Sequence, residues 1–340
     1  MAATTTSTGG QAQVSASAQV AARAAHRGAV ATLVLANTLW AGTYVAGKVA
    51  LRDLSPIELN AARFTIAALL LAPVLIRHHR AIPRDRATLF TLARLILLGW
   101  VLNKLFEYVG LALSTASDVA LLISTESLFF AVISWIVLRE RVTRAGVWAL
   151  ALGLAGAYLI VERGLAPSLG GPGGGARILG DLLVVLSLLF EAGYSAGGKA
   201  ALVQLPPLLL LAVTITGSLV IWIPAGLIAV VHTGPPHLAP AGWLSLLYMA
   251  AISGVAGYWL WFRALRTMDG SAAAPTLFIQ PLLGAALGIW LLHDAISWAT
   301  LAGAALILLS ILLVVRAQRR PSSVAPASPA PIAVISESIP

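Results

Sequence analysis

Long apolar runs separated by short polar segments dominate the chain from Val30 to Val315. A helix rises about 1.5 Å per residue, so about 20 apolar residues cross the hydrocarbon core of a bilayer. Counting runs near that length predicts ten membrane spans, with approximate limits at Val30–Leu51, Ile57–Ile76, Leu89–Leu113, Ala116–Leu138, Gly146–Val161, Leu179–Leu202, Pro207–Val231, Ala241–Ala264, Ser271–Leu292 and Ala299–Val315. The pattern therefore predicts an all-α integral membrane protein with ten transmembrane helices.

The two halves of this pattern resemble each other. Leu35–Leu51 aligns with Leu186–Leu202, and both segments carry an Ala-Gly pair, a later Gly-Lys pair and a closing Ala-Leu pair. At one matched position Trp40 in the first half is replaced by Glu191 in the second. Because each half holds an odd number of spans, we predict two inverted five-helix repeats.

The composition between and outside these halves predicts where the repeats begin and end. The predicted parts are a disordered N-terminal tail at 1–29, a first repeat at 30–162, a glycine-rich linker at 163–178, a second repeat at 179–316 and a disordered C-terminal tail at 317–340. The first tail is mostly Ala, Ser, Thr and Gln, and the last is mostly Pro, Ser and Ala. Neither tail has the continuous apolar core that ordered structure or a secretory signal requires.

Composition excludes a soluble globular protein. Apolar residues make up 59% of the chain and charged residues 10%, and the mean hydropathy is +0.90. The net charge of +9 comes from basic residues in short gaps between apolar runs, whereas a nucleic-acid binder gathers them on one solvated face. We therefore expect a lipid bilayer and no nucleic acid as partner. With no cysteine, the sequence leaves the redox compartment undetermined.

Basic residues are distributed unevenly between the two sides of the predicted bundle. Ten spans place both termini on one side, and Arg and Lys accumulate in cytoplasmic segments. With cytoplasmic termini, the inner segments hold most of them, including Arg77–Arg86 and Arg139–Arg144, while the outer loops hold Arg52, Arg163 and Arg177. We therefore predict a multi-pass protein of the cytoplasmic membrane with both termini in the cytoplasm.

Acidic and amide side chains occur near the middle of several spans, where a charge is costly unless protein or water surrounds it. Glu191 lies near the middle of the sixth span and shares a helical face with Tyr194. Glu126 lies near the middle of the fourth span and aligns with Gln280 in the second half. We interpret these residues as lining a cavity, with hydrogen bonds that join helices as the alternative for both acids.

The third span carries a second polar face, formed by Trp100, Asn103, Lys104 and Glu107. Lys104 and Glu107 stand one helical turn apart, so they are either a neutral structural pair or part of a site. Asn103 is a candidate binding residue on this face.

Aromatic and basic residues elsewhere also leave two interpretations open. Trp40 and Tyr44 stand at helical spacing and either pack in the core or contact a solute. Lys48 and Lys199, near helix ends, fit side chains that extend to the headgroups, and Arg63 either does the same or binds an anionic group.

Pro281 predicts a break or kink in the ninth span. Proline has no amide hydrogen to donate, so the carbonyl one turn earlier, near Leu277, loses its helical partner. Such a carbonyl inside a membrane must be satisfied by protein or water. We therefore expect Pro281 to bend this span beside the cavity.

Two short motifs match catalytic patterns, but their context excludes both. Gly193–Gly197 fits the nucleophile elbow, which needs a strand, a turn and a helix, yet it lies inside an apolar helix. Gly171–Ala176 has the glycine spacing of a dinucleotide fingerprint without a preceding strand. The six histidines are scattered and HExxH is missing. We therefore expect no enzyme, no catalytic residue, no cofactor and no metal site.

The order of the motifs resembles the EamA domains of the drug/metabolite transporter superfamily. The motifs are Leu39-Trp40-Ala41-Gly42 through Lys48, Pro56 with Arg63, Leu138-Arg139-Glu140-Arg141-Val142, Gly257-Tyr258-Trp259-Leu260-Trp261-Phe262-Arg263-Ala264-Leu265, and Pro281 followed by Asp294. The resemblance covers nearly everything from Val30 to Val315, and it implies a solute transporter. Ser127 and Asp294 depart from the usual proline and glutamate of that family, at a helix bend and an outer-loop cap.

Glu191 also has a spacing similar to that of the small multidrug resistance antiporters. Those four-span relatives carry a glutamate eight residues before a lysine in their first helix and exchange protons for cationic drugs there. Glu191 and Lys199 have this spacing. The similarity implies that Glu191 binds a proton or a cationic group of the substrate.

We therefore expect a secondary transporter, in the export direction by resemblance, which moves a small metabolite, amino acid or drug by alternating access with possible proton coupling. The expected partners are the small-molecule substrate and the bilayer, with the protein as a monomer or homodimer. The candidate residues for substrate or proton binding are Glu191, Glu126, Gln280, Trp40, Tyr44, Tyr194, Asn103 and Tyr258. The alternatives are a membrane scaffold or intramembrane enzyme, which would not transport solute, and a channel.

Overall fold

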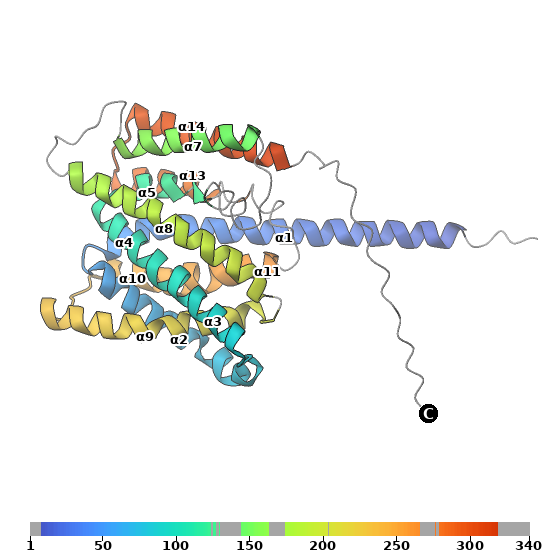
Figure 1. The fold of residues 1–340 in the computed structure, drawn as a ribbon, viewed down its shortest axis with the longest axis horizontal. Helices are drawn as coiled ribbons and strands as arrows, with labels where there is room; N and C mark the ends of the chain where they lie inside the picture. Colours follow the sequence, from blue (N-terminus) through green and yellow to red (C-terminus); the bar gives the residue numbers. More distant parts are fainter. Residues whose placement is uncertain are drawn as a thin grey trace, which may run out of the picture.

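The computed structural model describes residues 8–123, 125–126, 129, 144–162, 174–202, 204–265, 276 and 279–318, and every regular element among them is helical (Figure 1). The elements are α1 (Thr8–Ala50), α2 (Pro56–His78), η1 (His79–Ala81), α3 (Arg86–Leu95), η2 (Ile96–Leu102), α4 (Asn103–Leu113), α5 (Ala116–Ile123), α7 (Arg144–Glu162), α8 (Gly174–Ala201), α9 (Pro207–Thr233), α10 (Pro240–Leu247), η3 (Tyr248–Gly257), α11 (Tyr258–Leu265), α13 (Ile279–Leu292) and α14 (Trp298–Gln318). The all-α fold class is confirmed for these residues.

Six helices in the described part of the chain are long and apolar enough to cross a membrane. They are Gly28–Ala50, Pro56–Ala81, Arg86–Leu113, Gly174–Ser195, Pro207–Thr233 and Pro240–Ala264. These correspond to six of the ten predicted spans. Shorter apolar helices occur at Ala151–Ile160, Ile279–Leu292 and Trp298–Ser310, and they overlap three further predicted spans. Most of the fourth predicted span and the first part of the ninth lie outside the described residues.

The structure differs from the predicted tail and linker at two helix starts. α1 begins at Thr8, although we predicted disorder through residue 29. The intervening residues include many alanines, which favour a helix, and no proline interrupts them, so the helix extends upstream from the apolar span. α1 consequently projects beyond the bundle in Figure 1. α8 likewise begins at Gly174, five residues before the predicted span.

Local signals fix several other helix starts. Ser55 and Glu58 form a capping box at α2, in which the Ser55 amide donates to Glu58 Oε2 at 2.8 Å, and Pro56 occupies the first turn. Pro207 and Pro240 begin α9 and α10 in the same way. Asp85 caps α3, and the hydrogen bond from the Thr88 amide lowers the pKa of its carboxyl group.

The third and eighth predicted spans each contain a π-helical stretch, η2 and η3. The wider turns of a π-helix disturb the regular backbone ladder, and such stretches are frequent at functional sites. In both, a tryptophan from another helix donates to a backbone carbonyl. Trp222 Nε1 donates to Trp100 O at 2.8 Å, and Trp40 Nε1 donates to Ser253 O at 3.0 Å.

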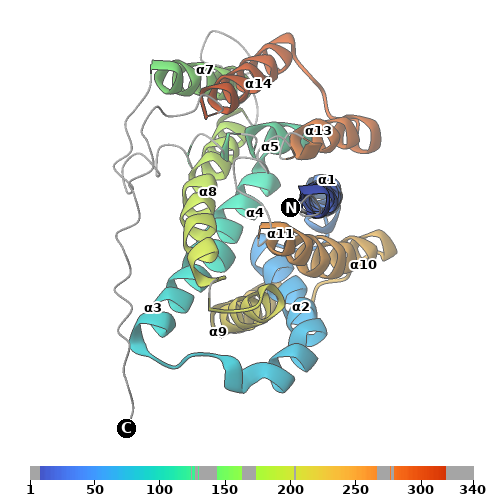
Figure 2. The same ribbon diagram turned by 90° about the vertical axis from the view of Figure 1, so that its right-hand side faces the viewer.

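The helices pack so that early and late parts of the chain alternate across the bundle (Figure 2). α2 lies against α9, α4 against α8, and α1 against α13 and η3, while α7 and α14 pair at one edge. Each pair joins a helix before residue 163 to one after residue 173. The described interior is therefore built mainly from contacts between the two halves.

Glycines allow the closest of these approaches. A Cβ at Gly110 would lie 2.5 Å from the Gly180 carbonyl oxygen, where α4 meets α8. A Cβ at Gly156 would lie 2.6 Å from the Gly303 carbonyl oxygen, where α7 meets α14. Small residues that bring backbones together are a principal means of helix association in membranes.

We expect Gly156→Ala to weaken the contact between α7 and α14 by about 1–3 kcal/mol, because the new methyl group meets backbone that cannot rotate away. Thermal denaturation of the purified protein in detergent should show a lower melting temperature. Gly28→Ala is the control, since nothing lies within 4 Å of its Cβ position. Alanine favours a helix over glycine by about 0.5–1 kcal/mol, so the control should be neutral or stabilising. A melting temperature for Gly156→Ala as high as that of the control would contradict the close packing.

A candidate solute cavity between the halves

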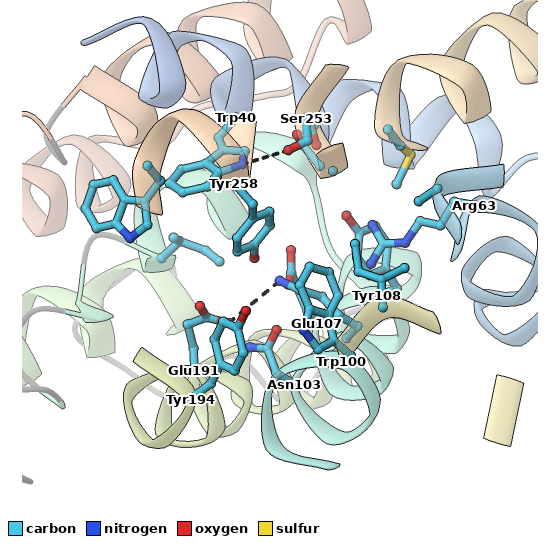
Figure 3. Close-up of a pocket in the computed structure, with 18 of the residues that line it drawn as sticks. Trp40, Arg63, Trp100, Asn103, Glu107, Tyr108, Glu191, Tyr194, Ser253 and Tyr258 are labelled. Carbon is cyan, nitrogen blue, oxygen red and sulfur yellow. Dashed lines mark hydrogen bonds and ion pairs between the residues drawn. The ribbon is translucent and has the colours of Figure 1, made fainter. Parts of the chain in front are cut away.

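A cavity lies inside the bundle, with walls from α1, α2, η2, α4, α5, α8, α9, η3, α11 and the start of α13 (Figure 3). All eight residues predicted to bind substrate or protons line it: Trp40, Tyr44, Asn103, Glu126, Glu191, Tyr194, Tyr258 and Gln280. They come from distant parts of the sequence, and the fold brings them together. Their roles in binding stay predictions.

Aromatic rings form a connected wall of this cavity. The Tyr258 ring centre lies 4.9 Å from that of Trp40 and 5.0 Å from that of Trp100. Tyr194 meets Trp100 edge to face at 5.8 Å. Since the indole N–H of Trp40 already donates to Ser253, this residue offers the cavity an aromatic surface rather than a donor. Rings at these separations suit an apolar or aromatic solute.

Three ionisable residues meet at the junction of α4 and α8. Lys104 Nζ lies 2.7 Å from Glu107 Oε2 and 3.9 Å from Glu191 Oε2. The predicted pair of Lys104 and Glu107 is therefore formed, and both residues also line the cavity. Glu191 Oε2 is buried and has no hydrogen-bond partner in the described part of the protein. Its distance from Lys104 leaves it able to accept a hydrogen bond from a proton-bearing group in the cavity.

Amide side chains connect the cavity wall to the helices behind it. Gln280 Nε2 donates to the Tyr44 hydroxyl, which joins α13 to α1. Asn103 Nδ2 donates to Ser187 O at 3.0 Å, while its buried Oδ1 has no partner among the described residues. Ser187, one helical turn before Glu191 on α8, is fully buried, and its hydroxyl donates to Val184 O. The polar face of α8 thus divides between the cavity and the contact with α4.

Pro281 is buried in the first turn of α13, which begins at Ile279. Leu277, whose carbonyl we predicted to be freed, and Ser127 lie outside the described residues. The bend at Pro281 therefore stays a prediction.

Lys48 has a different role from the one we favoured. Its Nζ donates to Leu111 O at 2.8 Å, to Ala112 O at 3.1 Å and to Ser114 O. Lys48 therefore caps the carboxyl end of α4 instead of extending to the headgroups. The side chain of Lys199 lies outside the described residues.

Other polar contacts gather at the same end of the bundle as this cap. Asp181 accepts hydrogen bonds from Arg177 Nη1, at 2.8 Å, and from the Ser114 hydroxyl. Asp294 Oδ2 accepts from the amide and the hydroxyl of Ser117, both at 2.9 Å, and so caps α5. Asp294 thus performs a capping role although it replaces the usual glutamate. These contacts tie α4, α5, α8 and α13 together beyond the cavity.

Several cavity residues were not among the predicted ones. Phe64, Ser253 and Phe262 line the cavity, as does Arg63, which we left between two interpretations. Phe262 follows Tyr258 by four residues in an aromatic-rich motif, so helical spacing could have identified it. Ser253 had no such signal, because its place in the wall depends on the π-helical turn of η3.

Comparison with known proteins shows what this chain is similar to. Residues 27–162 and 178–316 each match the EamA-like transporter family. Two uncharacterized transporters of Archaeoglobus fulgidus are 29% and 26% identical, over 84% and 85% of this chain and 97% of each relative. A probable amino-acid metabolite efflux pump of Salmonella typhimurium is 23% identical over 81% of this chain and 90% of that protein. A solved crystal structure aligns with a TM-score of 0.58 and 18% identity over 86% of this chain and 98% of the other, which supports the fold alone.

We expect Lys104→Met to destabilise the protein, because it leaves Glu107 and Glu191 in the cavity without their cation. Removing one partner of a buried ion pair typically costs about 3–5 kcal/mol, so thermal denaturation should show a clear fall in melting temperature. The double variant Lys104→Met/Glu107→Leu removes the pair together and should recover part of the loss. A single variant as stable as the wild type would show that the ion pair is not needed for packing.

Proposed function

Because the chain belongs to the EamA-like transporter family, it is a membrane transporter, and we propose that it exports a small organic solute by alternating access. The cavity carries this proposal: it lies inside the bundle, it is lined from both matched segments, and it combines aromatic, amide and ionisable groups. A purely structural membrane protein would have no use for so many polar groups at this depth. The solute binds in this cavity, and the two halves move against each other to expose it to either side.

The proposed architecture is ten spans in two inverted repeats of five. Its support is that two segments of similar length match the same family and that helices from one segment pack mainly on helices from the other. The π-helical stretches in the third and eighth spans add a further correspondence. An inverted pair of repeats gives a transporter two similar halves that can exchange conformations.

The polar contacts around Asp181 and Asp294 fit a closed end of the cavity. Positive charge in the predicted cytoplasmic segments assigns this end to the outer side. Exposure of the cavity to the outside would then require contacts such as those of Ser117 with Asp294 to separate. Hydrogen bonds of this kind contribute modestly to stability, so they can break and re-form in each cycle.

The chemistry of the cavity limits the solute to small amphipathic molecules. The aromatic wall suits an apolar or aromatic body, and the acids suit a positively charged group. One relative is named as a probable amino-acid metabolite efflux pump, which supports export of an amino acid or a related metabolite. Comparing the metabolites released by cells with and without overexpression would identify the solute.

Proton coupling is the proposed source of energy. Among the described residues, the cavity wall holds three acids, Glu107, Glu126 and Glu191, and Lys104 is the cation that the described ion pairs place next to them. Charges inside a membrane protein must be balanced, so a proton or a cationic group of the solute completes the balance at Glu191 or Glu126. If the proton and the cationic group of the solute bind in turn at one acid, solute export is coupled to proton entry.

We expect Glu191→Gln to abolish accumulation of the identified solute driven by a pH gradient in proteoliposomes, because glutamine keeps the shape but cannot exchange a proton. Counterflow without a gradient should remain, which also distinguishes a transporter from a channel. Glu58→Gln is the control, since a glutamine still completes the capping box of α2 outside the cavity.

The same assay decides between the two cavity acids. If Glu191→Gln accumulates the solute as the wild type does while Glu126→Gln does not, Glu126 is the coupling residue. If both variants couple normally, proton coupling itself is wrong.

The proposed topology predicts that a cysteine at Arg84 is cytoplasmic and one at His237 is outside. Both residues are exposed, and the natural chain has no cysteine, so each single variant carries one reactive thiol. A membrane-impermeant maleimide should label His237→Cys in intact cells and Arg84→Cys only after permeabilisation. The reverse pattern would invert the topology, and labelling of both in intact cells would contradict the number of spans between them.

A further inference from the structure

Arg63 is a buried cation in the cavity wall that no described carboxylate neutralises. It lies on α2 and is 5% exposed. The described ion pairs do not include it, and its Nε is buried without a hydrogen-bond partner among the described residues. It differs in this respect from Lys104, which lies next to two acids.

Two aromatic rings hold the Arg63 side chain in place. Its guanidinium carbon lies 4.4 Å from the ring centre of Phe64 and 4.2 Å from that of Tyr108. Stacking on rings satisfies the faces of a guanidinium through cation–π attraction but gives its Nε–H, which projects from the edge, no acceptor. The structure therefore orients a set of donors and supplies no acceptor for Nε.

A headgroup role does not account for this arrangement. Arg63 begins roughly 10 Å along α2 from Pro56, at about 1.5 Å per residue, and an arginine at that depth can reach the interface only with an extended, exposed side chain. Its burial against Phe64 and Tyr108 excludes that. A buried, unpaired charge is costly in a membrane, which points to an anion that is present only when the transporter is loaded.

We propose that Arg63 binds the carboxylate of the transported solute. A carboxylate matches the planar N–H fork of a guanidinium, and the resulting hydrogen bonds are among the strongest in proteins. A multiply charged anion such as phosphate is disfavoured, because Glu107, Glu126 and Glu191 line the same cavity. This inference deepens the proposed transport function and rests on it.

The rest of the cavity then sets the shape of the solute. Figure 3 shows Arg63 and Tyr108 on one side and Glu191 on the other, with Trp100 and Tyr258 between them. A solute with its carboxylate at Arg63 would lay an apolar or aromatic body along these rings. Any positive group that it carries would point toward Glu191 at the other side.

L-Phenylalanine and phenethylamine test the inference, because they differ only by the carboxylate. Binding of each is measured by calorimetry on the purified full chain in lipid nanodiscs, for the wild type, Arg63→Gln, Arg63→Lys and Arg77→Gln. We expect Arg63→Gln to weaken phenylalanine binding by about 10-fold or more, the loss of one to two charge-assisted hydrogen bonds. Phenethylamine binding should not change. Arg77, exposed at the end of the same helix, is the control and should leave both affinities unchanged.

The comparison separates recognition from a structural role. Equal loss of both ligands in Arg63→Gln, an unchanged affinity for phenylalanine, or no phenylalanine binding by the wild type would each contradict the inference. If Arg63→Gln does not fold, Arg63→Lys tests the inference in its place. Lysine keeps the positive charge but lacks the planar pair of N–H donors, so this variant should still bind phenylalanine more weakly than the wild type. If the wild type binds phenylalanine through Arg63 but proteoliposomes show no phenylalanine flux, the transport function fails and the anion site stands.

Discussion

The need to balance charge inside the bilayer is the constraint on which the centre of this protein depends. Lys104 lies 2.7 Å from Glu107 on its own helix and 3.9 Å from Glu191 on α8, so one cation serves two acids. An unpaired charge in this place is costly, and the balance holds only while α4 and α8 keep their register. Gly110 and Gly180 bring the same two helices into backbone contact. The charge balance in the cavity therefore depends on the same packing of α4 on α8 that these glycines allow.

Backbone polar groups impose a second constraint, because a membrane offers them no water. The chain meets it with side chains from neighbouring helices. Trp222 and Trp40 donate to carbonyls within the two π-helical stretches, and Lys48 caps the carbonyls at the end of α4. The irregular backbone of η2 and η3 is thus tolerated because other helices complete its hydrogen bonds. The same irregular turns place Trp100 and Ser253 in the cavity wall, so the device that satisfies the backbone also shapes the site.

Much of this arrangement could be predicted from the sequence, since apolar runs of membrane length and midplane polar residues have few alternative explanations. Glu191, Glu126 and Gln280 were identified because a polar group in an apolar run is conspicuous, and all three line the cavity. Lys48 was misjudged because its position near a helix end fits both a cap and a side chain that extends to the headgroups. Only the approach of α4 to α1 decides between them. The helical start of α1 was missed because alanine-rich, polar sequence is compatible with both disorder and helix.

The sequence repeat and the cavity together suggest why a duplicated bundle is useful for a polar solute. Equivalent positions in the two halves carry Trp40 and Glu191, or Glu126 and Gln280, by alignment of the sequence. A perfectly symmetric cavity would present the same charge to both ends of a solute, which would then bind in either orientation. Here the fold keeps two similar halves, while the cavity has Glu191, on α8, at one side and the Arg63 guanidinium, on α2, at the other (Figure 3). A solute with opposite charges at its two ends would therefore be oriented by electrostatics alone, before any contact of shape is made.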